Sequence, residues 1–250
     1  MMPTAKNPVG TTKKSFRVLE LLVELDGAGV SEVADALSLS KATTHHHLTT
    51  LEEMGYVVRW DDKYHVGSRF LALAGAARRR IGLDDSAVDI VDELAATTGE
   101  RVTVAAFECG YAVVLYTATG DRPAHDDLSP GDRLPLHTTA AGKAIFAQLD
   151  ADSVESIYRA YGTESFTEKT ITDRDALGDE LRMIRQQGLA FTRGEHHPDH
   201  YGVAAPITAD DRLVASLTVS GPKERIGGKG LQQDVAGLIV SAAKRVRHEL

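Results

Sequence analysis

The chain has 250 residues, a length that suits one large domain or two small ones. Hydrophobic residues make up 42% and charged residues 26%, which excludes a disordered chain and a collagen-like fibre. The apolar runs are far shorter than the ~20 residues that cross a bilayer and no signal peptide opens the sequence, so we expect no membrane contact and a cytoplasmic protein. The single cysteine, Cys109, excludes an internal disulfide, and its strand-like surroundings predict that it is buried.

Charge is divided unevenly along the chain. Residues 1–80 hold 11 Lys and Arg against 9 Asp and Glu, whereas residues 81–250 hold 17 against 27. The formal charge is therefore +2 for the first part and −10 for the second, within a total of −8. This asymmetry favours the first third as the part that meets a polyanion, because the remainder repels nucleic acid.

The first third shows short helices in close succession. Residues 1–12 lack apolar periodicity and are predicted to be a disordered tail. Apolar residues spaced by three and four then predict helices over 15–25, from an N-cap at Ser31, and over 41–54. The side chains of the first two helices that we expect to face the core are Val18, Leu19, Leu22, Leu25, Val33, Ala34 and Leu37.

The second and third helices, joined by a three-residue turn, match a helix-turn-helix. Residues 56–60 and 63–67 predict two strands around the tight turn Asp61-Asp62, which is a wing. We therefore expect a winged helix-turn-helix over 13–67, and the Ala- and Leu-rich residues 68–82 predict a connecting helix.

Residues 83–250 mix helical and β-rich segments. Helices are predicted over 84–98, 136–148, 153–161, 173–187 and 231–249, and strands over 101–107, 111–117, 189–191, 202–207 and 213–220. Short strands flanked by helices predict an α+β domain with a mostly antiparallel sheet. In the closing helix the side chains expected to face inward are Val235, Leu238, Ile239 and Ala242.

Four stretches, in order and at matching intervals, resemble the IclR family of transcriptional regulators. They are SFRVLELL with VSEVADALSLSKATTHHHLTTLEEMGYV, LPLHTTAAGKAIFAQL at 134–149, Gly188-Leu189-Ala190 with Ala204-Ala205-Pro206-Ile207, and LTVSGP at 217–222. The resemblance spans nearly the whole chain. It implies a winged-helix DNA-binding domain joined by a helix to a GAF-like effector and oligomerisation domain over 83–250, assembled as a homodimer or homotetramer on a double-stranded DNA operator.

The third helix is the candidate for reading DNA. If Thr44, Leu48 and Leu51 face the core, a rotation of about 100° per residue turns the other side toward the groove. The predicted DNA contacts are Ser40, Lys41, Ala42, Thr43, His45, His46, Thr50, Arg59 and Lys63. His46 stands where the family commonly has Arg, so it cannot make that residue's bidentate guanine contact. Solvated wing charges are the alternative interpretation of Arg59 and Lys63.

The resemblance also implies a small-molecule effector, namely an organic, aromatic or sugar acid. Carried over residue by residue, its contacts fall on Ala140, Ala141, Thr192, Glu195, Gly202, Thr218 and Ser220. Backbone amides at the start of the 136–148 helix are suitable donors for an acid. Thr218 and Ser220 alternate on one strand and share a face, with solvent-facing hydroxyls as the alternative. Thr192 and Gly202 replace a common Asp and Cys, which favours a somewhat larger anion.

Residues 195–200, EHHPDH, are the densest group of potential metal ligands, and His137 is a further one. A metal-dependent enzyme or metal sensor built on this histidine loop is the alternative function. No Gly-x-Ser-x-Gly elbow and no Gly-rich phosphate loop accompany it. An enzyme has no use for a winged helix, so we expect a regulator without catalytic residues, resident metal or cofactor.

Overall fold

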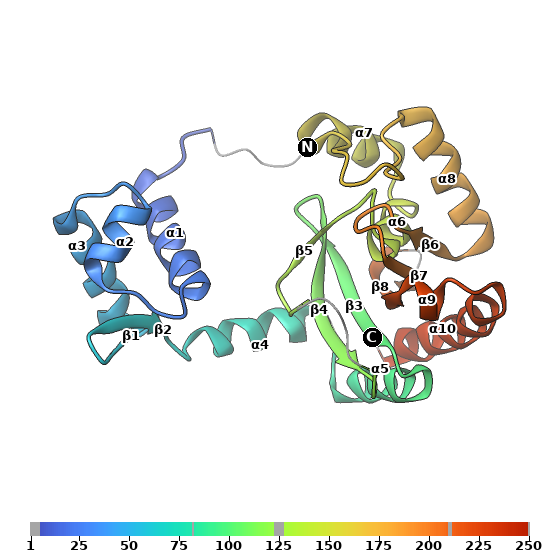
Figure 1. Ribbon diagram of the computed structural model, residues 1–250, viewed down its shortest axis with the longest axis horizontal. Coiled ribbons are helices and arrows are strands. Elements are labelled where there is room, and N and C mark those ends of the chain that lie inside the picture. Colours follow the sequence, from blue (N-terminus) through green and yellow to red (C-terminus); the bar gives the residue numbers. More distant parts are fainter. Residues whose placement is uncertain (1–5, 82, 123–127, 210–211, 250) are drawn as a thin grey trace. The chain divides into compact units, whose positions relative to one another are not determined.

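The computed structural model describes residues 6–81, 83–122, 128–209 and 212–249. Within these ranges the chain forms two compact units, residues 6–77 and residues 78–249 (Figure 1). The boundary falls inside helix α4 (Phe70–Ile81), in the segment predicted to connect the domains. None of the described helices is both long and apolar enough to cross a membrane.

The unit of residues 6–77 packs helices against a two-stranded hairpin. Its elements are α1 (Gly10–Glu24), α2 (Val30–Ala36), α3 (Lys41–Glu53), β1 (Val57–Trp60) and β2 (Lys63–Val66), followed by the start of α4. Helical spacing brings Val18 and Leu22 of α1, Val33 of α2 and Leu48 of α3 into one buried core. The predicted winged helix-turn-helix is confirmed.

The hairpin turn consists of Asp61 and Asp62, whose φ angles are 47° and 63°. Two consecutive residues with positive φ are typical of a type I′ turn, whose twist matches that of paired strands. Asp tolerates this region better than most residues because its short side chain bonds locally. Trp60 pairs with Lys63 directly beside the turn, so the wing is as tight as predicted.

Helix α1 begins earlier than the sequence predicted. Residues 10–12 form its first turn, and the Lys13 N–H already donates to the Val9 carbonyl at 3.2 Å. The prediction of a disordered tail over 1–12 was wrong for these three residues, because an exposed first turn needs no apolar positions. The part of that prediction concerning residues 1–5 lies outside the described residues.

Two other predictions for this unit were wrong at helix ends. The Glu32 carboxylate accepts a hydrogen bond from the Gly29 N–H at 2.8 Å, so Gly29, and not the exposed Ser31, is the N-cap of α2. Leu25 and Leu37 are C-cap residues beyond the last helical turns. Leu25 is therefore 46% exposed and Leu37 half-buried, where the periodicity predicted that both face the core.

The unit of residues 78–249 is built on one sheet with the strand order β5-β4-β3-β8-β7-β6. The strands are β3 (Arg101–Glu108), β4 (Tyr111–Thr119), β5 (Arg133–Pro135), β6 (Ala190–Arg193), β7 (His200–Ala209) and β8 (Arg212–Pro222). Each pairing in the described part of this sheet is antiparallel. The predicted α+β fold with an antiparallel sheet is confirmed.

Helices cover both faces of this sheet, as Figure 1 shows. They are α5 (Asp85–Thr98), α6 (Ala140–Phe146), α7 (Ala151–Tyr161), α8 (Arg174–Gln187), α9 (Lys223–Ile226) and α10 (Lys229–Glu249). Helices α5 and α10 pack on one face, and α6 with α8 lies on the other. The sequence did not predict the short elements β5 and α9.

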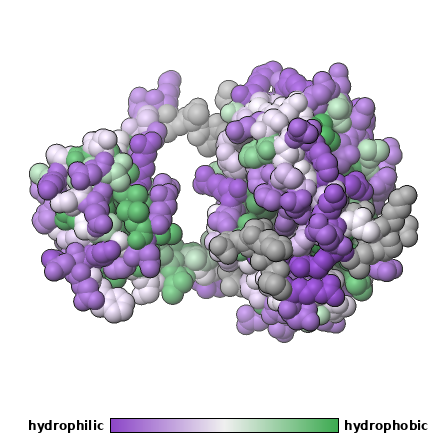
Figure 2. All heavy atoms as spheres, viewed as in Figure 1, coloured by the Kyte–Doolittle hydropathy of each residue, from purple (hydrophilic) through white to green (hydrophobic). Residues whose placement is uncertain are grey.

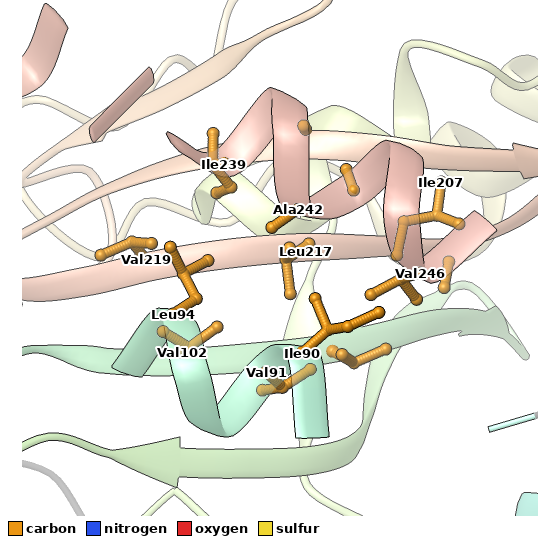
Figure 3. Packing of buried hydrophobic residues seen from close by; sticks show 14 of the residues in the cluster. Ile90, Val91, Leu94, Val102, Ile207, Leu217, Val219, Ile239, Ala242 and Val246 are labelled. Carbon is orange, nitrogen blue, oxygen red and sulfur yellow. The ribbon is translucent and has the colours of Figure 1, made fainter. Parts of the chain in front are cut away.

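Alternation along the central strands separates two environments. Val102 on β3 and Leu217 and Val219 on β8 point into the core under α5 and α10, where they meet side chains such as Ile239 (Figure 3). Their neighbours in the chain point the other way, because successive side chains of a strand face opposite sides of the sheet. The face under α6 therefore receives Arg101 and the hydroxyl residues of β8.

Helix α6 is shorter than the predicted 136–148 helix. The Thr139 hydroxyl accepts a hydrogen bond from the Gly142 N–H at 3.0 Å and so begins the helix at the following residue. Residues 133–135 pair with β4 instead of leading into a helix. The range predicted as one helix, 136–148, thus contains the N-cap Thr139 and the shorter helix α6.

Two predictions of burial were wrong in this unit. Leu238 on α10 is 41% exposed because it lies beside the stripe that Val235 and Ile239 bury. Cys109 is exposed because it and Gly110, both with positive φ, form the turn between β3 and β4. The apolar residues on either side of Cys109 belong to the strands.

Helix α6 packs closely against the preceding segment at Gly142, and a substitution there tests this packing. A Cβ there would lie 2.4 Å from the Pro135 carbonyl oxygen, whereas a Cβ at Gly178 in α8 would meet no atom within 4 Å. We expect Gly142→Ala to lower the unfolding free energy by about 1–3 kcal/mol through overpacking. Gly178→Ala should raise it by about 0.5–1 kcal/mol, because Ala is the better helix former. Urea unfolding of both variants checks this, and two changes of the same sign would contradict it.

Candidate nucleic-acid interface and ligand cavity

Helix α3 buries one side and exposes the other. Thr44, Leu48 and Leu51 are buried, as the predicted rotation of this helix requires. Thr43 is half-buried, and the predicted DNA contacts on the exposed side are Lys41, Ala42, His45, His46 and Thr50. The exposed side of α3 is thus polar and available to a partner.

Two hydroxyls fix the beginning of α3. The Ser40 Oγ accepts a hydrogen bond from the Thr43 N–H at 3.1 Å and lies 2.8 Å from the Thr43 Oγ1. Ser40 is thus the N-cap, and both hydroxyls already have a partner within the protein. The His46 ring is exposed on the same helix. His46 is therefore better placed than Ser40 or Thr43 to meet a new partner without breaking a cap.

The wing carries two exposed cations, Arg59 and Lys63. The Arg59 guanidinium lies 2.6 Å from the Asp62 carboxylate. The hydrogen bond with Asp62 and the charge of Asp62 raise the pKa of Arg59. Because Asp62 offsets the charge of Arg59, Lys63 is the stronger candidate for a phosphate contact.

His47 ties the DNA-reading candidate helix to α1. Its Nδ1 lies 2.9 Å from the Ser15 Oγ, and the ring is buried between the two helices. Burial, followed by the charges of Lys14 and His46, lowers the pKa of His47, so the ring is neutral at pH 7. The three consecutive histidines therefore differ, because His45 and His46 are exposed and His47 is part of the core.

The second unit contains a cavity of about 680 Å³ against the sheet face under α6. Its lining includes five of the predicted effector contacts, namely Ala140, Ala141, Thr192, Thr218 and Ser220. These residues come from α6, β6 and β8, so the fold brings together segments that are about 80 residues apart in the chain. A volume of this size suits a small organic molecule.

The floor of the cavity follows the strand register. Thr192 pairs with Gly202, Gly202 with Ser220, and Ser220 with Arg101. Directly opposed residues of antiparallel strands point to the same face, so this row crosses four strands beneath the cavity. The neighbouring row consists of Ala204, Thr218 and Thr103. Arg101 and Thr103 also line the cavity, and the resemblance had not pointed to them.

Gly202 lies in this row of the sheet and has no side chain. A Cβ there would lie 3.3 Å from both the Ser220 Cβ and the Thr192 Cγ2, two residues that line the cavity. Gly202 itself is not part of the lining. At Gly202 the structure thus shows a space between the Thr192 and Ser220 side chains and not a lining residue, and its role in effector binding stays a prediction.

Acidic residues lie mostly at the rim of the cavity. Asp132, Asp199 and Glu224 line it and are exposed. The buried Glu100 also lines it, but its carboxylate is held by Arg225 at 2.7 and 2.9 Å and by Arg122 at 3.4 Å. Among the described lining residues, the buried ones other than Glu100 are small residues such as Ala140 and Ala141, threonines, Ser220 and Arg101.

Glu195 is engaged elsewhere, which corrects its predicted role as an effector contact. Its Oε1 lies 2.8 Å from the Nζ of Lys143, a side chain that is 1% exposed and also binds Glu180 at 3.0 Å. Its Oε2 accepts hydrogen bonds from the Thr192 hydroxyl and the Arg193 N–H. Burial raises the pKa of Glu195, but Lys143 and these hydrogen bonds more than offset that effect, so the pKa is lowered.

The histidine loop does not form a prepared metal site. His196 Nδ1 lies 3.2 Å from the Thr138 Oγ1, and His137 Nε2 donates to the Glu164 carbonyl at 2.8 Å. Among the residues that the structure describes, no three His, Cys, Asp or Glu side chains are arranged to hold one metal ion. The loop instead contributes His196, His197 and His200 to the cavity wall.

The winged helix and the second unit, which holds a ligand-sized cavity, each match a family model of transcriptional regulators. The model of the IclR helix-turn-helix domain matches residues 11–60, and that of the bacterial transcriptional regulator IclR C-terminal domain matches residues 76–248. The chain therefore belongs to the IclR family of transcriptional regulators.

Relatives align over most of their length. The chain is 29% identical over 241 residues to the HTH-type transcriptional regulator KdgR of Escherichia coli, which covers 94% of this chain and 91% of KdgR. It is also 29% identical over 243 residues to the probable HTH-type transcriptional regulator ArcR of Halobacterium salinarum, with 94% and 92% covered.

Solved structures share the fold. The crystal structure of the Thermotoga maritima IclR has a TM-score of 0.81 at 25% identity, with 96% of this chain and 98% of that chain covered. An IclR homologue from Microbacterium hydrocarbonoxydans, complexed with 4-hydroxybenzoate, has a TM-score of 0.81 at 20% identity, with 96% and 99% covered.

The buried ion pair yields a prediction that depends on pH. Lys143→Met leaves Glu195 buried without its cation, which should lower the unfolding free energy at pH 7 by about 3–5 kcal/mol. The lowered pKa of Glu195 stabilises the native protein above the unfolded-state pKa, and this stability is lost as the pH falls. Without Lys143 the pKa is raised, so the difference between variant and wild type should shrink toward pH 4.

Urea unfolding at pH 7 and pH 5 measures this difference. The double variant Lys143→Met/Glu195→Gln is the control, because it removes the buried charge that the single variant leaves unpaired. It should recover part of the lost stability at pH 7. Equal stability of the single and double variants at both pH values would contradict the role given to Glu195.

Proposed function

We propose that the chain is a cytoplasmic, ligand-responsive regulator that binds a double-stranded operator through residues 13–67 and a small anionic effector through residues 83–250. The coexistence of an exposed polar α3 with a ligand-sized cavity whose buried lining includes several hydroxyls carries this proposal. It acts as a homodimer or homotetramer, so that two winged helices read two half-sites. Neither a cofactor nor a catalytic step is part of the proposal.

DNA binding requires two kinds of contact, namely contacts that read the bases and contacts that position the helix on the phosphates. We assign base reading to the exposed first turns of α3, with Ala42, Thr43 and His46 nearest the bases. Lys41 and Lys63 contact phosphates, which position the helix without reading sequence. Arg59 joins them when it exchanges Asp62 for a phosphate. Ser40 supports this surface as the cap of α3.

Effector binding belongs to the cavity. The hydroxyls of Thr218 and Ser220 and the backbone at Ala140 and Ala141 supply the polar contacts. The gap at Gly202 favours a ligand larger than a two- or three-carbon acid. The complex of the Microbacterium hydrocarbonoxydans homologue with 4-hydroxybenzoate supports an organic acid as the class of ligand.

The DNA assignment is tested with two substitutions and an operator selected from a random duplex library. His46→Ala should change base preference, with a loss of about 1–3 kcal/mol on the selected operator and little on random DNA. Lys63→Ala should weaken binding to all sequences alike and reduce the salt slope by about one unit. Fluorescence anisotropy over a range of salt concentrations measures both effects.

The matched control for charge is Lys244→Ala, which removes an exposed cation of α10 outside the winged helix. It should leave the salt slope unchanged. If His46→Ala loses the same binding free energy on the operator and on random DNA, His46 does not read bases.

The effector assignment is tested at Ser220. Ser220→Ala should weaken binding of an acid that releases DNA by about 0.5–1.5 kcal/mol, the contribution of one neutral hydrogen bond, without changing DNA affinity in the absence of the acid. Ser216→Ala is the control, because Ser216 lies on the same strand and face but outside the cavity lining. Calorimetric titration of aromatic and sugar acids measures the affinities. Identical affinities of wild type and Ser220→Ala would exclude Ser220 from the site.

A further inference from the structure

We propose that the winged-helix unit contains a second ligand site, a groove between α1 and α3 that binds an uncharged aromatic molecule with an N–H or O–H donor. His47 accepts the hydrogen bond of this donor. The site is separate from the cavity of the second unit. A ligand in the groove weakens DNA binding, and only this last step rests on the proposed DNA-binding function.

The groove lies within the unit of residues 6–77 and has a volume of about 670 Å³. Its apolar lining comes from α1, from the end of α3 and from the start of α4, and includes the exposed side chains of Phe16, Met54 and Leu73. No Asp, Glu, Lys or Arg is part of the described lining. An ion in the groove would lose water without gaining a counter-charge, so the groove suits an uncharged ligand.

Aromatic rings are the ligand groups that match this lining. The rings of Phe16, Tyr56 and Phe70 line the groove and offer packing partners for a flat ligand. The thioether of Met54 adds favourable contacts to ring edges. Phe16 is 57% exposed and Met54 is 49% exposed, so a bound ring system would remove apolar surface from water.

Hydrogen bonds between α1 and α3 fix the proton of the His47 ring. The Ser15 Oγ lies 3.2 Å from the Thr11 carbonyl oxygen and 2.9 Å from the His47 Nδ1. A carbonyl only accepts and a hydroxyl has one proton, so both bonds form together only when Nδ1 carries the ring proton and donates it to Ser15. Burial lowers the pKa of His47, so Nε2 has no proton at pH 7.

The His47 Nε2 is thus a hydrogen-bond acceptor without a partner among the described residues. The ring is only 8% exposed and lines the groove, and Nε2 is not sealed from solvent. A ligand N–H or O–H would satisfy this atom in apolar surroundings, where a hydrogen bond is stronger than in water. The acceptor therefore selects aromatic molecules that carry a donor.

The groove shares three residues with the predicted DNA contacts. Thr43, His46 and Thr50 line it, and all three lie on α3. A ligand in the groove contacts side chains that DNA would also contact, so the two compete. By linkage, the ligand weakens operator binding by the same factor by which the operator weakens binding of the ligand.

The experiment compares two aromatic donors with their methylated analogues. The probes are indole with 1-methylindole and 2-naphthol with 2-methoxynaphthalene, all uncharged at pH 7, titrated calorimetrically into the full chain without DNA. In wild type at least one donor should bind about 3- to 10-fold more tightly than its analogue, the effect of one neutral hydrogen bond. His47→Leu should remove this advantage while the groove stays apolar. His45→Leu is the matched control and should retain the advantage, because His45 is an exposed residue of α3 outside the groove lining.

Phe16→Ala keeps the test decisive if His47→Leu fails to fold. It shortens an exposed wall of the groove and leaves the acceptor in place, so a donor and its analogue should both lose affinity, about 3- to 10-fold and to the same extent. Unchanged affinities in Phe16→Ala would place the bound probe outside the groove and overturn the proposal.

Competition with DNA is measured by fluorescence anisotropy on the selected operator. The donor that binds more tightly than its analogue should weaken operator binding to wild type. In His47→Leu the same effect should need a concentration about 3- to 10-fold higher, because the affinity for the donor is lower by that factor.

The outcomes separate the site from the proposed function. If the donors bind no better than their analogues, or equally well to wild type and His47→Leu, the site is wrong. If a donor binds through His47 but leaves operator affinity unchanged, competition with DNA is wrong. If wild type binds no operator, the DNA-binding proposal fails, while the titrations without DNA still decide on the site. If sedimentation shows a dimer that Phe16→Ala dissociates and no probe binds, the groove is an interface between copies of the chain and the proposal is wrong.

Discussion

The alternation of side chains along the central parts of β3, β7 and β8 is the constraint on which the second unit depends. Every second residue, such as Val102, Leu217 and Val219, enters the core under α5 and α10. The intervening residues must face the other side, and there Arg101, Thr218 and Ser220 become the floor of a cavity. A shift of one residue in register would exchange the two sets and place a guanidinium in the apolar core. The same strand pairing thus specifies both the apolar core and the floor of the cavity.

The Lys143 network shows how distant segments support that cavity. One ammonium joins α6, α8 and the segment after β6 through Glu180 and Glu195. Desolvation makes such a buried pair costly to form, so its contribution lies in geometry more than in net stability. It holds the loop that carries His196 and His197 next to the α6 end of the cavity. In the winged helix, a buried polar side chain likewise joins two elements, because the neutral His47 of α3 bonds to Ser15 of α1. There an imidazole and a hydroxyl join the helices without a buried charge. Apolar side chains nevertheless reach the surface of this unit, where Figure 2 shows green atoms. Phe16 and Met54 are among the exposed apolar residues of the unit.

Sequence patterns predicted what is local and periodic. The helix-turn-helix, the wing turn at Asp61-Asp62 and the shared face of Thr218 and Ser220 follow from spacing alone, and the structure confirms these elements. The errors arise where a long-range partner or a cap decides. The partner of Glu195 lies 52 residues away, which no local pattern contains. Ser31 was predicted as the N-cap of α2, but the Glu32 carboxylate accepts a hydrogen bond from the Gly29 N–H, and Gly29 is the N-cap. Arg101 was missed because a charged residue at the start of a strand is ordinary in sequence, and only the register shows that it lies opposite Ser220.

The missing side chain at position 202 has an evolutionary consequence. The backbone of Gly202 pairs with β6 and β8 like any other strand residue, so a small side chain there would leave the ladder of hydrogen bonds in place. It would, however, project between Thr192 and Ser220 and reduce the room above them. One substitution can therefore change the room inside the cavity while the fold is inherited unchanged. The size of the cavity is thus open to evolution separately from the strand pairing that builds it.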